Sequence, residues 1–110
     1  MKESDLRSKV TALLRTRGAR PIKYYGCAYS EAGIPDILAP YRGRFLFLET
    51  KLPGNKPTPI QSRVMSQLAA PRAEAIGGTV YSVEDAAYYL DLIDAMVDGS
   101  LFPTPPPPHT

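Results

Sequence analysis

The sequence has few of the residues on which many familiar active sites depend. Its 110 residues include one cysteine, one histidine and no tryptophan. Cys27 therefore cannot form an internal disulfide, and His109 lies in a proline-rich tail. Because the only histidine lies in this tail, a cysteine protease, a histidine-based nuclease and a histidine-rich zinc site are all disfavoured. We expect a reducing, cytoplasmic environment.

Long apolar runs and nucleotide-binding motifs are also missing. No stretch approaches the roughly 20 apolar residues that cross a bilayer, and the acidic N-terminal residues 1–5 are not those of a signal peptide. No Gly-x-x-x-x-Gly-Lys-Ser/Thr loop is present, so we expect neither a membrane partner nor a nucleotide cofactor. The length suits one compact domain.

Charge is distributed unevenly along the chain. Residues 1–63 hold 12 of the 13 Lys and Arg and 5 of the 11 Asp and Glu, a net charge of +7. Residues 64–110 have a net charge of −5. A basic first part favours an anionic partner such as nucleic acid. A solvated surface with uneven charge would account for the same pattern.

Three segments have the apolar spacing of amphipathic helices. The first is expected to begin after a cap at Ser4. The second begins with Thr58-Pro59-Ile60-Gln61, a capping box with proline at the first helical position, and Pro71 ends or kinks it. The third is capped by Ser82 and stopped by Gly99.

Four short segments are typical of strands, namely residues 22–27, 36–39, 44–51 and 79–81. Residues 40–43, Pro-Tyr-Arg-Gly, are typical of a hairpin turn between the second and third strands. The predicted order is α-β-β-β-α-β-α. This order predicts an α/β fold with a mixed β-sheet flanked by helices.

The last ten residues differ in composition from the rest. Residues 101–110 contain five prolines, and we expect this tail to be extended or disordered, because it is too proline-rich to pack. The folded domain is accordingly predicted over residues 1–100.

The third predicted strand carries the strongest chemical signal. Residues 45–48 are all apolar, which predicts a central strand buried on both faces. Glu49 and Lys51 follow it and, two residues apart, project from the same face. Burying such charges is costly unless they are paired or used. A structural ion pair at the end of the strand remains an alternative to a catalytic role.

Asp36 adds a second carboxylate. If the hairpin turns at residues 40–43, Asp36 and Glu49 lie near the same end of neighbouring strands. Two carboxylates beside Lys51 form a hard oxygen-ligand site for Mg²⁺, with Mn²⁺ as a substitute. Such a site suits phosphodiester hydrolysis. A turn residue after Pro35 is the alternative for Asp36.

Three motifs together resemble a known family. Gly33-Ile34-Pro35-Asp36, Phe47-Leu48-Glu49-Thr50-Lys51 and Pro59-Ile60-Gln61 are similar to the PD-(D/E)XK nuclease pattern. They resemble its VRR-NUC branch, the virus-type replication-repair nucleases, and small stand-alone phage members in particular. The resemblance covers residues 1 to about 90 and implies a restriction-endonuclease-like core.

The resemblance implies roles for individual residues. Asp36 and Glu49 match the metal-binding carboxylates, the main-chain carbonyl of Thr50 matches a further metal ligand, and Lys51 matches the catalytic lysine. Gln61 matches a glutamine close to the active centre.

Two assignments on the helices remain open. A glutamine in a capping box bonds back to the cap residue, which explains Gln61 without catalysis. The family also uses an acidic metal ligand on its first helix. Glu3 is the predicted match and Asp5 the alternative, while the next helical turn offers Arg7 in place of an acid.

Five basic residues near the proposed site in sequence are predicted to bind nucleic acid backbone phosphates. They are Lys23, Arg42, Arg44, Lys56 and Arg63. Ordinary solvated loops are the alternative explanation.

The sequence therefore favours a metal-dependent DNA endonuclease. The resemblance extends this expectation to Holliday-junction or other branched DNA and to a homodimer. An inactive nucleic-acid-binding module of the same fold is the first alternative. A partner-binding protein whose proline-rich tail is the ligand is the second.

Overall fold

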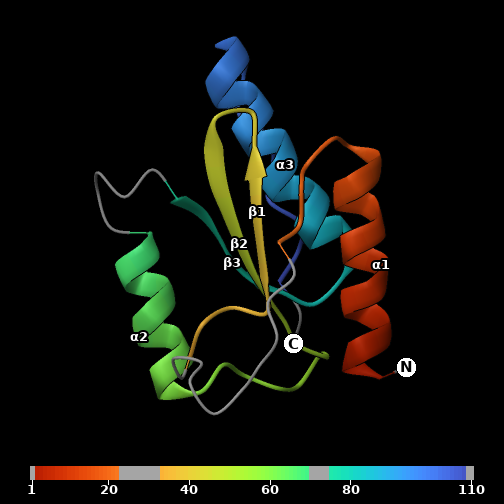
Figure 1. Cartoon of the computed structure of the whole chain (residues 1–110), viewed down its shortest axis with the longest axis vertical. Helices are drawn as coiled ribbons and strands as arrows, with labels where there is room; N and C mark the ends of the chain where they lie inside the picture. The colour runs from red at the N-terminus through yellow and green to blue at the C-terminus, as the bar shows by residue number, and fades with distance from the viewer. Residues whose placement is uncertain (1, 23–32, 70–74, 109–110) are drawn as a thin grey trace.

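The structure, a computed structural model, describes residues 2–22, 33–69 and 75–108. Three helices and a three-stranded mixed sheet make up this part of the chain (Figure 1). In chain order the elements are α1 (Glu3–Thr16), β1 (Ile37–Tyr41), β2 (Arg44–Thr50), α2 (Pro59–Leu68), β3 (Ala75–Val80) and α3 (Val83–Asp98). The predicted α/β class is confirmed.

The cap of helix α1 lies two residues before the predicted one. Lys2 is the cap residue, and its backbone N–H donates to the Asp5 carboxylate at 3.0 Å. Ser4 lies inside the first turn, so the predicted cap at Ser4 is wrong. Asp5 supplies the acceptor that the first turn needs, and its charge favours the positive end of the helix dipole. The apolar face of α1 is buried through Leu6, Val10 and Leu14.

The hairpin between β1 and β2 is tighter than expected. Strand β1 continues to Tyr41, and the turn consists of Arg42 and Gly43 alone. Both residues have positive φ angles, 48° and 79°, which is the conformation of a type I′ turn. This two-residue turn fixes the register, in which Ile37 pairs with Leu48.

Strand β2 is the centre of the sheet, as predicted. It pairs with β1 in the antiparallel and with β3 in the parallel direction. Leu46, Phe47 and Leu48 are completely buried. Leu46 and Leu48 belong to the core formed with α1 and α3, and Phe47 points to the opposite face. Helix α2 lies on that opposite side, near β3 (Figure 1).

Strand β3 is longer than its predicted span of residues 79–81. It begins at Ala75 and includes Gly77 and Gly78. A Cβ atom at Gly77 would overlap the carbonyl oxygen of Phe47 on the neighbouring strand. Glycine therefore lets β3 approach β2 closely, whereas strand propensity alone disfavours it there.

The remaining boundaries agree well with the sequence. Thr58 caps α2 with Pro59 at the first position, and the Ser82 side chain accepts from the backbone N–H of Asp85 at the start of α3. Gly99 ends α3 with a φ of 71°. No helix in the described part of the chain combines the length and apolarity that a membrane crossing requires.

Two predictions fall on residues that the structure does not describe. Of the predicted strand 22–27, Ile22 forms an antiparallel bridge with Leu38 of β1. Residues 23–27, including Lys23 and Cys27, lie outside the described ranges, and so does Pro71.

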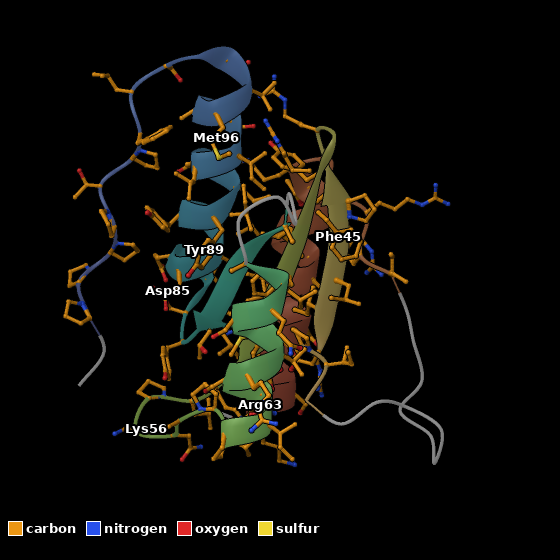
Figure 2. The ribbon with its side chains drawn as sticks, turned by 90° about the vertical axis from the view of Figure 1, so that its left-hand side faces the viewer. Phe45, Lys56, Arg63, Asp85, Tyr89 and Met96 are labelled. Atoms are coloured by element: carbon orange, nitrogen blue, oxygen red, sulfur yellow. The ribbon has the colours of Figure 1, made fainter. Side chains whose placement is uncertain are left out.

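The tail packs more than its composition suggested. Residues 101–108 form no helix or strand, yet they run beside α3 as an extended segment (Figure 2). Pro103 and Pro106 are half-buried, and Pro105–Pro108 line a pocket with residues of β3 and α3. Of the two predicted states, extended or disordered, residues 101–108 adopt the extended one, and two of their prolines nevertheless pack against the protein.

The close approach at Gly77 can be tested by substitution. We expect Gly77→Ala to lower the free energy of unfolding by about 3 kcal/mol or more, because the added methyl group meets rigid backbone. Gly78→Ala is the control. Its Cβ would meet only the hydroxyl end of Tyr89, and we expect a loss of about 1 kcal/mol. Chemical denaturation measures both, and equal losses would contradict the explanation.

Candidate active site

Two carboxylates meet at one end of the sheet. Asp36 immediately precedes β1, and Glu49 is the penultimate residue of β2. Because Ile37 pairs with Leu48, the hairpin register places Asp36 opposite Glu49. The backbone N–H of Asp36 donates to Glu49 Oε2 at 3.1 Å. The structure thus brings together the pair that the sequence placed at one end of two strands.

The Asp36 carboxylate is held by Thr50. Its Oδ1 accepts from the Thr50 backbone N–H at 3.1 Å, and its Oδ2 accepts from the Thr50 hydroxyl at 2.6 Å. Thr50 was predicted only as a main-chain metal ligand, so this side-chain role was missed. A fully buried hydroxyl beside a charged motif needs a hydrogen-bond partner, and that requirement was the available signal.

Gln61 uses both ends of its amide. Its Oε1 accepts from the backbone N–H of Thr58 at 2.9 Å, which completes the capping box of α2. Its Nε2 donates to Glu49 Oε1 at 2.9 Å. Both interpretations of Gln61, as a capping residue and as a residue of the site, hold at the same time. Since the cap requires the oxygen on one side, the NH₂ group must face the carboxylate.

Lys51 lies next to the carboxylates on the same face of the strand. Its Nζ is 3.9 Å from Glu49 Oε1, and the two side chains are 15% and 6% exposed. This is the separation of a loose ion pair, weaker than a short hydrogen-bonded contact. Both Glu49 oxygens are thus engaged, Oε1 by Gln61 and Lys51 and Oε2 by the Asp36 amide.

The carboxyl groups hold protons more tightly than in water. Burial raises the pKa of Glu49 to about 7, and the nearby negative charge of Asp36 adds to this rise. Burial also raises the pKa of Asp36, although hydrogen bonds from Thr50 and the charge of Arg7 partly offset it. Two acids that destabilise one another's charge are typical of sites that bind a cation or move a proton.

Helix α1 contributes charges of both signs. Glu3 is half-buried, and its charge raises the pKa of Asp36 and of Glu49. Asp5, the alternative acid, is instead used to cap the helix. One turn after Glu3, Arg7 places Nη1 at 3.5 Å from Asp36 Oδ2. Arg7 was expected only as a departure from the family pattern, and its place in the site was not predicted.

The donor set suits a hard divalent cation. Asp36 and Glu49 supply carboxylate oxygens, and the Thr50 carbonyl lies between the two motif positions Glu49 and Lys51 in the chain. Within the described ranges, no three Asp, Glu, His or Cys side chains are grouped closely enough to hold a metal ion. Glu3 therefore acts on the pair through its charge and does not complete a three-acid cluster in this arrangement.

The predicted phosphate-binding residues separate into two groups. Lys56 and Arg63 are exposed and lie at the end of the molecule away from Phe45, the end where β2 finishes (Figure 2). Arg44 is at the start of β2, about 17 Å of extended strand from Glu49 at 3.3 Å per residue. Lys23 lies outside the described residues.

Arg42 is at the far end and has other partners. Its guanidinium contacts Asp94 at 2.9 Å and Asp98 at 2.7 Å on α3. Asp94 also accepts from Arg17 of the α1 C-terminus and from the Tyr41 hydroxyl. Arg42 and Arg44 are near Glu49 in the sequence but lie at the opposite end of the hairpin, because β2 runs from Arg44 to Thr50. Their predicted binding of phosphates stays a prediction.

Comparison with known proteins supports the fold. No family model and no curated protein matches the sequence. A solved structure described as a VRR_NUC domain superposes with a TM-score of 0.65, covering 84% of this chain and 94% of that one. The identity is 23%, so the likeness establishes the fold. The chain has the fold of a VRR_NUC domain, which confirms the resemblance seen in the motifs at the level of architecture.

The raised pKa of Glu49 predicts how stability depends on pH. The folded pKa of about 7 exceeds the ordinary value of 4.5, so the folded state holds the proton more tightly. Stability is then full below about pH 4.5 and falls as the pH rises through 7. The loss amounts to about 3 kcal/mol. Glu49→Gln should remove this loss between pH 5 and pH 8 in urea denaturation without added metal.

Glu84→Gln is the matched control, because Glu84 is an exposed acid at the start of α3. It should retain the pH dependence of the wild-type chain. If Glu49→Gln and wild type lost equal stability between the two pH values, the buried carboxylate would not be the cause.

Proposed function

We propose that this protein is a metal-dependent nuclease that hydrolyses phosphodiester bonds in DNA. The observation that carries the proposal is the Asp36–Glu49 pair, hydrogen-bonded at one end of the sheet with Lys51 and Gln61 beside it. The fold of a VRR_NUC domain supports the same reading. A single ion pair would account for Lys51 and Glu49, but it would not account for the second, half-buried carboxylate of Asp36 at the same end of the sheet.

Each residue of the site has a distinct part in this proposal. Asp36, Glu49 and the carbonyl of Thr50 would hold Mg²⁺ or Mn²⁺. When bound, the cation would neutralise phosphate charge and lower the pKa of a water molecule. Lys51 would orient that water or stabilise negative charge on the phosphate. The Thr50 hydroxyl and the Gln61 amide fix the two carboxylates, which otherwise repel each other.

The protonation of the pair fits a site that awaits a cation. Both carboxyl groups have raised pKa values, and each must be ionised to bind a metal. A dication between them would remove their mutual repulsion. The resemblance extends the proposal to branched DNA as the substrate and to a homodimer, which would present two sites to two strands.

A second function is favoured by one observation. Arg7 already contacts Asp36, and no third acid joins the carboxylate pair within the described residues. An arginine in place of an acidic ligand would suit a module that binds nucleic acid without cleaving it. Metal-dependent cleavage separates this alternative from the nuclease.

The first experiment is a cleavage assay on labelled four-way-junction and duplex DNA with Mg²⁺, Mn²⁺ or EDTA. We expect cleavage only with metal. Glu49→Gln and Lys51→Ala should each lower the rate at least about 100-fold, because each removes a charge that acts on the reacting phosphate or its metal. DNA binding by Glu49→Gln should remain.

The matched controls are Glu84→Gln and Lys9→Ala, which make the same changes at exposed positions. Both should cleave like the wild-type chain. Binding without cleavage under every metal would favour the inactive module. Joint loss of binding and folding in Glu49→Gln would favour a structural ion pair.

The two groups of basic residues predict different effects on DNA binding. Lys56→Ala combined with Arg63→Ala should weaken binding. The fall of log K with log salt should become less steep by about 2 units of slope, since two phosphate contacts are lost. Arg44→Ala, at the other end of β2, should leave both unchanged. Fluorescence anisotropy over a range of salt concentrations provides the measurement, and equal effects of Arg63→Ala and Arg44→Ala would contradict this assignment.

A further inference from the structure

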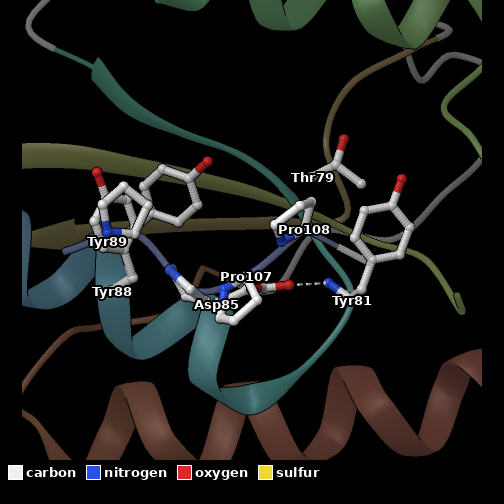
Figure 3. A pocket seen from close by; sticks show the side chains of 9 residues that line it. Thr79, Tyr81, Asp85, Tyr88, Tyr89, Pro107 and Pro108 are labelled. Atoms are coloured by element: carbon white, nitrogen blue, oxygen red, sulfur yellow. Dashed lines mark hydrogen bonds between the residues drawn. The ribbon is translucent and has the colours of Figure 1, made fainter. Parts of the chain in front are cut away.

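A cluster of tyrosines lies beside the proline-rich tail, at the start of α3. Tyr81, Tyr88 and Tyr89 line a pocket of about 310 Å³ together with Thr79 and Asp85. The remaining wall of this pocket is formed by Pro105–Pro108 (Figure 3). We call the surface of Tyr81, Tyr88 and Tyr89 the tyrosine groove. The mechanism proposed above uses none of these residues.

The half-buried positions of the tail are three residues apart. Between residues 101 and 108 the exposed positions are interrupted only at Pro103 and Pro106, which are half-buried. A polyproline II helix has three residues per turn, so positions 103 and 106 share one face. The burial pattern is therefore that of a polyproline II segment laid against the protein along one edge. The spacing is also Pro-x-x-Pro, the pattern that aromatic grooves recognise.

Contacts within the protein hold the residues of the tyrosine groove in position. The rings of Tyr88 and Tyr89 are 5.3 Å apart and inclined by 65°, an edge-to-face arrangement. Tyr89 extends over Gly78, where a Cβ would come within 2.7 Å of its hydroxyl. The backbone N–H of Tyr81 donates to Asp85 at 2.8 Å, which ties the end of β3 to α3 (Figure 3).

We propose that the tyrosine groove is a binding site for polyproline II segments with Pro-x-x-Pro spacing. The chain's own tail covers the groove and forms one wall of its pocket, and a proline-rich segment of a partner protein binds there when the tail leaves. Flat tyrosine faces pack on proline rings, and a polyproline II ligand loses little conformational entropy on binding. The attached tail competes as though present at millimolar concentration, so it keeps weaker ligands out.

The test uses the full chain and a fluorescein-labelled peptide with the sequence of residues 101–110. Pro103→Ala/Pro106→Ala removes the two packed prolines and should free the groove. This variant should bind the peptide at least about tenfold more tightly than the wild-type chain does, because the attached competitor is weakened. Leu101→Ala/Thr104→Ala is the matched control, since it changes two exposed tail residues at the same spacing that do not line the pocket. It should behave like wild type.

A further variant locates the peptide. Adding Tyr88→Ala to Pro103→Ala/Pro106→Ala should weaken peptide binding at least about tenfold, while Tyr41→Phe in the same background should not, because Tyr41 is on β1 at the far end. Circular dichroism verifies that each variant is folded. Absence of saturable binding by the freed variant, or equal binding by every variant, would overturn the proposal.

Light scattering distinguishes attachment within one chain from exchange between two. If the wild-type tail occupies its own groove, peptide binding should be unmasked in Pro103→Ala/Pro106→Ala with no change of mass. A wild-type mass that rises with concentration and falls in this variant would instead show that tails exchange between copies, which would overturn covering of the groove by the chain's own tail.

Discussion

The structure depends on a carboxylate placed at the end of a strand that is buried on both faces. Strand β2 has apolar residues on both sides, so its end projects Glu49 from an apolar environment. A charge there is unfavourable unless other groups surround it. The hairpin supplies the Asp36 amide, and the cap of α2 supplies the Gln61 amide. Donors from the hairpin and from the helix cap thus converge on the Glu49 carboxylate. They offset only part of the cost of burying its charge, in agreement with its raised pKa.

The basic residues of the first part of the chain fall into two groups at opposite ends of the sheet. At the hairpin turn, Arg17 and Arg42 pair with acids of α3, which joins the basic first part to the acidic last helix. These ion pairs join α1, the hairpin and α3. At the other end, Lys56 and Arg63 remain exposed. In the proposed function, these exposed residues are the ones that meet nucleic acid.

The sequence predicted the roles of residues that depend on their neighbours in the chain. It did not predict the roles of residues that depend on contacts between distant segments. The capping box at Thr58–Gln61, the buried run of β2 and the pairing of Asp36 with Glu49 each follow from spacing or from one turn. The positions of Arg42, Arg44 and Arg7 depend on strand length and on how α1 packs, which no local pattern contains. Gly77 misled the strand prediction for the same reason. Its role is an approach to Phe47, thirty residues earlier in the chain.

Strand β3 connects the proposed active site to the tyrosine groove. Thr79 pairs with Glu49 in the parallel register and also lines the groove, while Val80 accepts from the backbone N–H of Lys51. Thr79 therefore adjoins both the proposed active site and the tyrosine groove. An edge strand carries unpaired backbone groups that invite other chains, and the extended tail occupies the region beside it. Proline has no backbone N–H, so the prolines of the tail can lie near this strand without donating hydrogen bonds that would extend the sheet.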